Sequence, residues 1–336
     1  PDGNFILGES PELKNFYVGA GFNAYGIAAG GGAGMALAEW IANGQPPYDL
    51  WPVDIRRFGK PHQDLEWVRK RTYEAYAKHY TMAWPFEEHS SGRPFQQSPI
   101  YENLKNANAC FGEKLGWERP NWFAPKSMEP VDHYTYDRQN WFEVVGEEVK
   151  ATREKAVLID QTSFAKFEIS GPQALDALEY LCANNINKEI GSTIYTQMLN
   201  NHGGIECDVT ITRIEDDCFY LVTGTGFMTH DFDWIKSNLT NFPDVKIENV
   251  TYQKSVFSLM GPNSRQILEK VSSNDLSNES FPFATAQSVN IGDKIVRAIR
   301  ITYMGELGWE LHFPIEDANY VYDKLFEAGE EFGLVN

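Results

Sequence analysis

One sequence pattern occurs twice in this chain, as Phe-Glu-Ile-Ser-Gly-Pro-Gln-Ala at residues 167–174 and as Phe-Ser-Leu-Met-Gly-Pro-Asn-Ser at residues 257–264. Each copy reads as a β-strand that ends at Gly-Pro, and a helix can begin there because proline is favoured in the first helical turn. Leu178 and Leu268 follow their strands at the same spacing. The repeat predicts two related β-turn-α units and a duplicated α+β fold, with chance recurrence of Gly-Pro as the alternative.

Between the two units, residues 195–210 read Tyr-Thr-Gln-Met-Leu-Asn-Asn-His-Gly-Gly-Ile-Glu-Cys-Asp-Val-Thr. A Gly-Gly pair between two β-rich runs predicts a hairpin, which would bring Tyr195 and Asp208 toward the same region. Side chains alternate along a strand, so we expect Glu206 and Asp208 on one face and Cys207 on the other. An acid in such a place is otherwise a solvated surface group.

A second constellation follows the second unit, where residues 300–311 read Arg-Ile-Thr-Tyr-Met-Gly-Glu-Leu-Gly-Trp-Glu-Leu. This stretch predicts a strand, a glycine turn and a second strand, with Tyr303 and Glu310 on the two sides of the turn.

The first sixty residues are rich in glycine. We expect a short strand over residues 14–21, a turn at Ala-Ala-Gly-Gly-Gly-Ala-Gly over residues 28–34, and a helix over residues 35–43. Backbone N–H groups at such a turn could point at an electron-rich ligand, assisted by the helix dipole. A helix packed tightly on a sheet is the alternative, and the stretch is not a GxGxxG fingerprint.

Residues 60–140 are rich in proline and aromatic side chains. A helix is expected over residues 64–80. Tryptophan-rich runs such as Gly-Trp-Glu-Arg-Pro at residues 116–120 bury large areas, so this stretch is predicted to be packed structure and not a flexible linker.

The composition is that of a globular protein, since 42% of the 336 residues are hydrophobic and 23% are charged. A formal net charge of −18 argues against nucleic acid or an anionic membrane as a partner, because binding either needs an excess of lysine and arginine. No apolar run approaches the roughly 20 residues that span a bilayer. The four cysteines and seven histidines show no metal-ligand spacing, so we expect reduced thiols and no metal.

Several of these stretches together resemble known families. Gly-Gly-Ile-x-x-Asp at residues 203–208 and Tyr-x-Gly-Glu-x-Gly-x-Glu at residues 303–310 resemble the aminomethyltransferase (T-protein) of the glycine cleavage system. Residues 1–58 and the connector motif Ser-Ser-Gly-Arg-Pro at residues 90–94 resemble dimethylglycine and sarcosine dehydrogenases, which carry the same carboxyl-terminal domain.

The resemblance implies a folate site. Asp208 falls on the acid that meets the pterin and N10 side of tetrahydrofolate, and Tyr195 and Tyr303 fall on folate-contacting tyrosines. Glu310 falls on the glutamate that hydrogen-bonds the pterin ring, where a carboxylate can receive paired N–H donors. The T-protein has two consecutive aspartates where this chain has Cys207 and Asp208, so Asp208 is the catalytic candidate.

The resemblance also implies part of a flavin site. Gly21, Asn23, Gly26 and Ile27 fall on the turn and helix that face the pyrimidine edge of FAD in the dehydrogenases. The pyrophosphate-binding segment and the flavin-attaching histidine of the family are expected upstream. We therefore expect this piece alone to hold FAD weakly.

Taken over the whole chain, the resemblance implies three segments: the carboxyl end of an FAD-dependent oxidoreductase domain at 1–60, a connector at 61–140, and an aminomethyltransferase-like folate-binding domain at 141–336, truncated at its end. The implied activity is oxidative demethylation of dimethylglycine or sarcosine at FAD, with transfer of the one-carbon unit to tetrahydrofolate. The implied partners are the small N-methylated amine and an electron acceptor such as an electron-transfer flavoprotein or oxygen, in the bacterial cytoplasm or the mitochondrial matrix.

Two alternatives remain open. One is a non-catalytic regulatory protein of the same architecture, like the pyruvate dehydrogenase phosphatase regulatory subunit. The other is a folate-dependent aminomethyltransferase or demethylase that acts on another small methylated compound.

Overall fold

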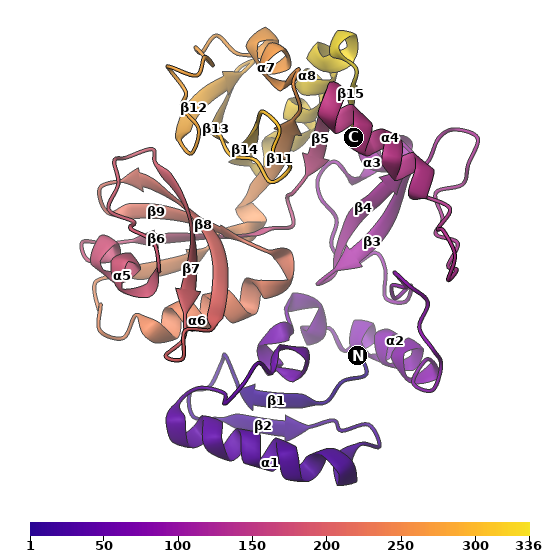
Figure 1. Cartoon of the computed structure of the whole chain (residues 1–336), viewed down its shortest axis with the longest axis vertical. Coiled ribbons are helices and arrows are strands. Elements are labelled where there is room, and N and C mark those ends of the chain that lie inside the picture. Colours follow the sequence, from indigo (N-terminus) through magenta and orange to yellow (C-terminus); the bar gives the residue numbers. More distant parts are fainter.

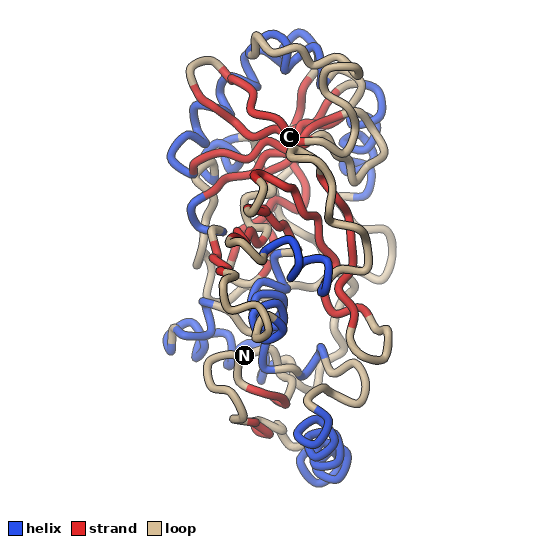
Figure 2. The backbone as a smooth tube through the Cα atoms, turned by 90° about the vertical axis from the view of Figure 1, so that its left-hand side faces the viewer, coloured by secondary structure: helices blue, strands red, loops and turns tan.

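The computed structural model describes residues 1–336 throughout. The chain begins with a two-stranded antiparallel sheet of β1 (Ile6–Glu9) and β2 (Tyr17–Ala20), covered by the helix α1 (Gly26–Asn43). Ala33, Ala36 and Trp40 are the buried residues of α1. These elements form the lower end of the molecule (Figure 1), and Figure 2 shows the same end from the side.

Helix α1 begins earlier than the sequence predicts. Gly30 to Gly34 lie inside the helix, so the expected glycine turn over 28–34 is wrong. The chain reverses before Gly26 instead, where Asn23 and Ala24 adopt positive φ angles of 45° and 74°. Glycine costs about 1 kcal/mol in a helix but is sterically allowed there, and burial of one face of α1 offsets that cost.

The connector is packed, as its aromatic content predicts. Helix α2 (Leu65–Ala77) confirms that a helix lies in the expected stretch. Asp64 caps it, because its side chain accepts hydrogen bonds from the amides of Glu66 and Trp67. The hairpin of β3 (Ala109–Lys114) and β4 (Trp117–Phe123) buries Trp117 and Trp122. Helix α3 (Tyr101–Asn106) completes this part. Three 3-10 turns come before α2, and α4 comes after the hairpin, at Trp51–Val53, Ile55–Arg57, Lys60–Gln63 and Phe142–Glu154.

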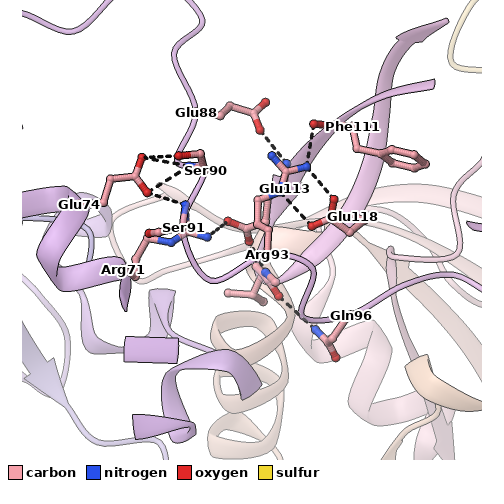
Figure 3. A network of polar contacts seen from close by, with 12 residues as sticks. Arg71, Glu74, Glu88, Ser90, Ser91, Arg93, Gln96, Phe111, Glu113 and Glu118 are labelled. Carbon is pink, nitrogen blue, oxygen red and sulfur yellow. Dashed lines mark hydrogen bonds and ion pairs between the residues drawn. The ribbon is translucent and has the colours of Figure 1, made fainter. Parts of the chain in front are cut away.

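Buried charges join α2, the following loop and this hairpin (Figure 3). Arg93 donates to the Glu118 carboxylate and to the carbonyl of Phe111, both at 2.7 Å. Arg71 of α2 donates to Glu113 of β3 at 2.9 Å. These contacts join three segments of the connector, so we assign the network to holding the connector together.

Two larger sheets form the rest of the molecule. The first has the order β10-β6-β9-β8-β7, and the second has the order β12-β13-β14-β11-β5-β15. The strands of the first sheet are β6 (Ala165–Ser170), β7 (Thr193–Leu199), β8 (Ile205–Glu215), β9 (Cys218–Thr223) and β10 (Lys246–Asn249). Those of the second are β5 (Ala156–Asp160), β11 (Lys254–Met260), β12 (Ala286–Ile291), β13 (Lys294–Ile299), β14 (Gly308–Pro314) and β15 (Leu334–Val335).

The repeated sequence pattern is confirmed as a repeated structural unit. Strand β6 leads through Gly-Pro into α5 (Ala174–Leu181), and β11 leads in the same way into α7 (Ser264–Val271). At both glycines φ lies near +120°, and an added Cβ would approach a backbone carbonyl oxygen to 2.0 Å at Gly171 and 2.5 Å at Gly261. Glycine is required at both turns for this reason.

Each sheet has its helices on one face. A core of 18 buried residues lies between the first sheet and the helices α5 and α6 (Met228–Asn238). A core of 23 buried residues lies between the second sheet and the helices α7 and α8 (Ala318–Gly329). The two sheets touch at a smaller cluster that includes Tyr220 of β9 and Ile299 of β13. No helix of the chain is long and apolar enough to cross a bilayer.

Candidate functional site

The predicted hairpin forms, and it brings Tyr195 and Asp208 together. Gln197 pairs with Asp208 and Tyr195 pairs with Thr210, so Tyr195 and Asp208 are diagonal neighbours on one face of the sheet. Both side chains are exposed, and the Gln197 amide donates to Asp208 Oδ1 at 3.1 Å. A hydrogen bond from the hydroxyl to the Asp208 carboxylate raises the pKa of Tyr195.

A β-bulge moves Glu206 away from this face. Leu199 pairs with Ile205 and Met198 pairs with Cys207, so Glu206 is the extra residue between the two pairs. Its carboxylate lies 3.4 Å from His230 Nε2 on α6, on the side of the sheet where Cys207 is buried. The expectation that Glu206 faces the same way as Asp208 is therefore wrong.

Tyr303 lies in a loop and not at the end of a strand. Strand β13 ends at Ile299, and the Thr302 hydroxyl accepts hydrogen bonds from the amides of Met304 and Gly305, which turns the chain. The expected strand through residues 300–303 is therefore wrong, because local side-chain bonds compete with the sheet. The Tyr303 side chain is exposed.

Glu310 is recessed, unlike the other three candidates. It lies on β14, opposite Ser258 of β11, on the face turned toward the first sheet, and its side chain is 13% exposed. The Ser258 hydroxyl is buried and has no hydrogen-bond partner. An unpaired buried hydroxyl beside a carboxylate fits a polar ligand that would bind both groups.

The residues expected to face FAD cluster at the amino-terminal end of α1. Gly21, Asn23, Gly26 and Ile27 are exposed, and the first turn of α1 has neither a side-chain cap nor an acidic residue. Its amide groups are thus available to an electron-rich ligand. The Asn23 side chain itself donates to the carbonyl of Gly3 at 2.9 Å, which is a local bond.

A buried polar cluster between the first sixty residues and the first sheet was not expected from the sequence. Arg56 donates to Asp54 at 2.7 Å and lies 3.6 Å from Asp233 of α6. Trp51 packs edge-on against His230, beside a cavity of about 610 Å³ that His230 and Glu206 also line. The only signal in the sequence is the spacing of Asp54 and Arg56, which is too common to identify a buried pair.

His230 is the centre of this cluster. Burial alone would lower the pKa of His230, but its bonds to Asp231 and Glu206 raise it above the ordinary value. Cys207, His230 and Asp231 place their ligand atoms within 4.8 Å of one another, a spacing that could hold a metal ion. Their hydrogen bonds are already satisfied within the cluster, since Thr223 also donates to Asp231 at 2.6 Å, so we assign no metal here.

Comparison with protein families identifies two domains in the chain. Residues 100–336 match the GCVT N-terminal domain, and residues 43–98 match the FAD dependent oxidoreductase central domain. The chain belongs to the GCVT family. Its fold is an aminomethyltransferase-like α+β domain joined to part of an FAD-dependent oxidoreductase, as the sequence resemblance implied.

Relatives match the chain over its full length. The mitochondrial sarcosine dehydrogenase of Mus musculus is 36% identical over all of this chain and 41% of its own length. The mitochondrial dimethylglycine dehydrogenase of Mus musculus is 37% identical over 99% of this chain and 38% of its own length. The mitochondrial pyruvate dehydrogenase phosphatase regulatory subunit of Mus musculus is 33% identical over all of this chain and 39% of its own length. The chain thus spans about two fifths of the length of these relatives.

A solved structure shows the same fold. The glycine cleavage system aminomethyltransferase T from Bartonella henselae superposes with a TM-score of 0.58 at 24% identity, over 72% of this chain and 59% of that one. It supports the assignment of the two sheets and their helices to the aminomethyltransferase fold.

Proposed function

We propose that the protein containing this chain is an oxidoreductase that demethylates dimethylglycine or sarcosine at FAD and passes the one-carbon unit to tetrahydrofolate. The observation that carries the proposal is the pairing of two parts in one chain. A segment that matches the FAD dependent oxidoreductase central domain and a segment that matches the GCVT N-terminal domain lie in one chain. The second segment carries Asp208 and Glu310, which we assign to folate binding. Full-length relatives named as sarcosine and dimethylglycine dehydrogenases support it.

The flavin-facing part of the site is assigned to Gly21, Asn23, Gly26 and Ile27. The uncapped first turn of α1 can stabilise negative charge on a bound ligand, because helix amino-terminal amides carry partial positive charge. When bound, FAD would take up the two electrons removed from the amine. The rest of the flavin and amine site is expected from parts of the protein outside residues 1–336.

The folate part is assigned to Asp208, Tyr195, Tyr303 and Glu310. The exposed Asp208 carboxylate can stabilise a cationic imine and move a proton. The two exposed tyrosines can cover the faces of a planar ring, and Glu310 with the unpaired Ser258 hydroxyl can receive and donate hydrogen bonds at its edge. When bound, tetrahydrofolate would supply the amine that accepts the one-carbon unit.

We propose the boundaries 1–60, 61–140 and 141–336 for the oxidoreductase part, the connector and the folate-binding part. The buried Arg56 cluster would then fix the first part against the third. Such contacts keep an oxidation site and a transfer site in constant relative position.

One experiment tests the proposal against a regulatory role. The full-length protein is purified, and its visible absorbance is followed as dimethylglycine or sarcosine is added without oxygen. Bleaching of a flavin spectrum by either amine, and formation of methylene-tetrahydrofolate when tetrahydrofolate is supplied, are the expected results. A full-length protein that carries no flavin would point to the regulatory alternative. A flavin that neither amine reduces would contradict dimethylglycine and sarcosine as substrates.

A further inference from the structure

Two buried side chains, His312 and Tyr220, connect Glu310 to the first sheet. His312 lies two residues further along β14, on the same face, and its side chain is 1% exposed. His312 Nε2 lies 3.3 Å from Glu310 Oε2, and His312 Nδ1 lies 3.1 Å from the hydroxyl of Tyr220. Tyr220 is fully buried on β9 of the first sheet, so this row of three side chains crosses from one sheet to the other.

The chemistry of the end groups fixes the proton positions in this row. A carboxylate can only accept hydrogen bonds, so the Nε2 of His312 must carry a proton and donate it to Glu310. In a neutral imidazole the other nitrogen is then unprotonated, and it accepts the hydrogen bond of the Tyr220 hydroxyl. Tyr220 makes no other side-chain hydrogen bond that would draw its proton elsewhere.

The surroundings keep both groups in these protonation states. Burial lowers the pKa of His312, with further lowering by Lys166 and Arg297, although Glu310 acts in the opposite direction. Burial also raises the pKa of Tyr220. At neutral pH the imidazole is therefore uncharged and the phenol remains a donor.

We propose that Tyr220 and His312 are positioning residues that hold Glu310 with one oxygen occupied and the other, Oε1, directed to a ligand. This role rests on the proposed folate site, in which Tyr220 and His312 hold the Glu310 carboxylate in place. Glu310 Oε1 takes part in no hydrogen bond in the structure, and the unpaired Ser258 hydroxyl lies on the neighbouring strand. The ligand class that fits is a planar heterocycle with N–H donors on its edge.

Because Tyr220 and Glu310 belong to different sheets, the row also makes ligand binding depend on how the two sheets pack. A ligating side chain is commonly held by such outer partners, whose loss costs affinity without any lost contact to the ligand. If His312 and Tyr220 had a purely structural role, their loss would lower the free energy of unfolding and leave the affinity for the ligand unchanged.

Two substitutions of the same residue separate these roles. In His312→Gln the side-chain amide nitrogen can take the place of Nε2 and still donate to Glu310. In His312→Asn the shorter amide takes the place of Nδ1 and leaves Glu310 without its donor. Both variants lose the ring, so thermal unfolding of each serves as the control for folding.

The measurement is the dissociation constant of 5-formyl-tetrahydrofolate, an oxidation-stable probe, for the full-length protein. We expect His312→Asn to weaken binding roughly tenfold or more, the scale of one hydrogen bond to a charged group, and His312→Gln to stay within about threefold of the parent. Equal affinities for the two variants would overturn the positioning role and leave the proposed function standing. Failure of the parent itself to bind the probe would overturn both.

A second readout needs no ligand. ¹⁵N shifts of histidine-labelled protein distinguish protonated from unprotonated ring nitrogens, and the His312 signals are identified by their loss in His312→Gln. We expect Nε2 protonated and Nδ1 unprotonated at neutral pH. In Tyr220→Phe the Nδ1 signal should shift because its donor is gone. A proton on Nδ1 of the parent protein would overturn the inference.

Discussion

Asp208→Asn isolates the transfer step from the oxidation step. The change keeps the shape of the side chain and removes its charge. Asp208 is exposed, and the hydrogen bond that it accepts from Gln197 at 3.1 Å can be kept by the asparagine oxygen. Folding stability should therefore change by no more than about 0.5 kcal/mol, as for an ordinary surface substitution.

The effect on chemistry should be much larger. A carboxylate that stabilises a cationic imine and moves a proton contributes typically about 10²–10⁴-fold to a rate. Asp208 lies on β8 of the first sheet, which Figure 1 shows apart from α1 at the lower end of the molecule. Exposed charges are screened beyond a Debye length of about 8–10 Å. Flavin reduction by the amine should thus stay nearly unchanged.

The assay follows two quantities in the full-length protein: the rate of flavin bleaching, and the ratio of methylene-tetrahydrofolate to free formaldehyde per amine oxidised. We expect the variant to release more formaldehyde at an unchanged bleaching rate. Asp217→Asn, an exposed acid in the turn after β8, is the matched control and should behave like the parent. If bleaching slowed by the same factor as methylene-tetrahydrofolate formation, the transfer role of Asp208 would be wrong.

Four other outcomes are expected. Arg56→Ala leaves buried carboxylates unpaired and should lower the free energy of unfolding by about 3–5 kcal/mol in urea titration, whereas Arg138→Ala, whose pair is exposed, should cost under about 1 kcal/mol. Gly146→Ala in α4 meets open space and should stabilise by about 1 kcal/mol, whereas Gly261→Ala should destabilise because its Cβ would strike a carbonyl. Burial lowers the pKa of His62 to about 4, so the neutral imidazole contributes stability that is complete above about pH 6.5 and is lost as the pH falls toward 4. In His62→Gln the free energy of unfolding should therefore change less between pH 6.5 and 4 than in the parent. Residues 1–336 expressed alone should purify without stoichiometric flavin, and a yellow product at one FAD per chain would refute the partial-site assignment.

Much of the fold follows from local sequence. Several turns and caps depend only on residues adjacent in the chain, and the backbone preferences of those residues can be predicted from their identity. Examples are the two Gly-Pro turns, the Gly-Gly hairpin and the Asp64 cap. The same holds for Tyr195 and Asp208, which a short hairpin brings together as diagonal neighbours. Side chains that meet through regular alternation can be predicted once the strand and its turn are known.

Other features depended on packing. The helix α1 begins at Gly26 because Trp40 and its neighbours bury one face against β1 and β2, which outweighs the low helix propensity of its five glycines. The bulge at Glu206 is a single-residue departure from a regular strand, and the turn at Thr302 follows the end of β13. No periodicity in the sequence indicates either of them. As a result, the Glu206 and Tyr303 side chains point in directions that regular alternation along a strand does not predict.

The sequence by itself determined that this chain carries a duplicated α+β fold with Asp208 and Glu310 in two separate motifs. Only the tertiary structure decided what surrounds those acids. Tyr220 and His312 are 92 positions apart and meet at 3.1 Å because the inner faces of two sheets pack together. Arg56 reaches Asp233 for the same reason, across the boundary between the first residues and α6. Contacts of this kind depend on how whole sheets and helices pack, and a local pattern carries no information about that.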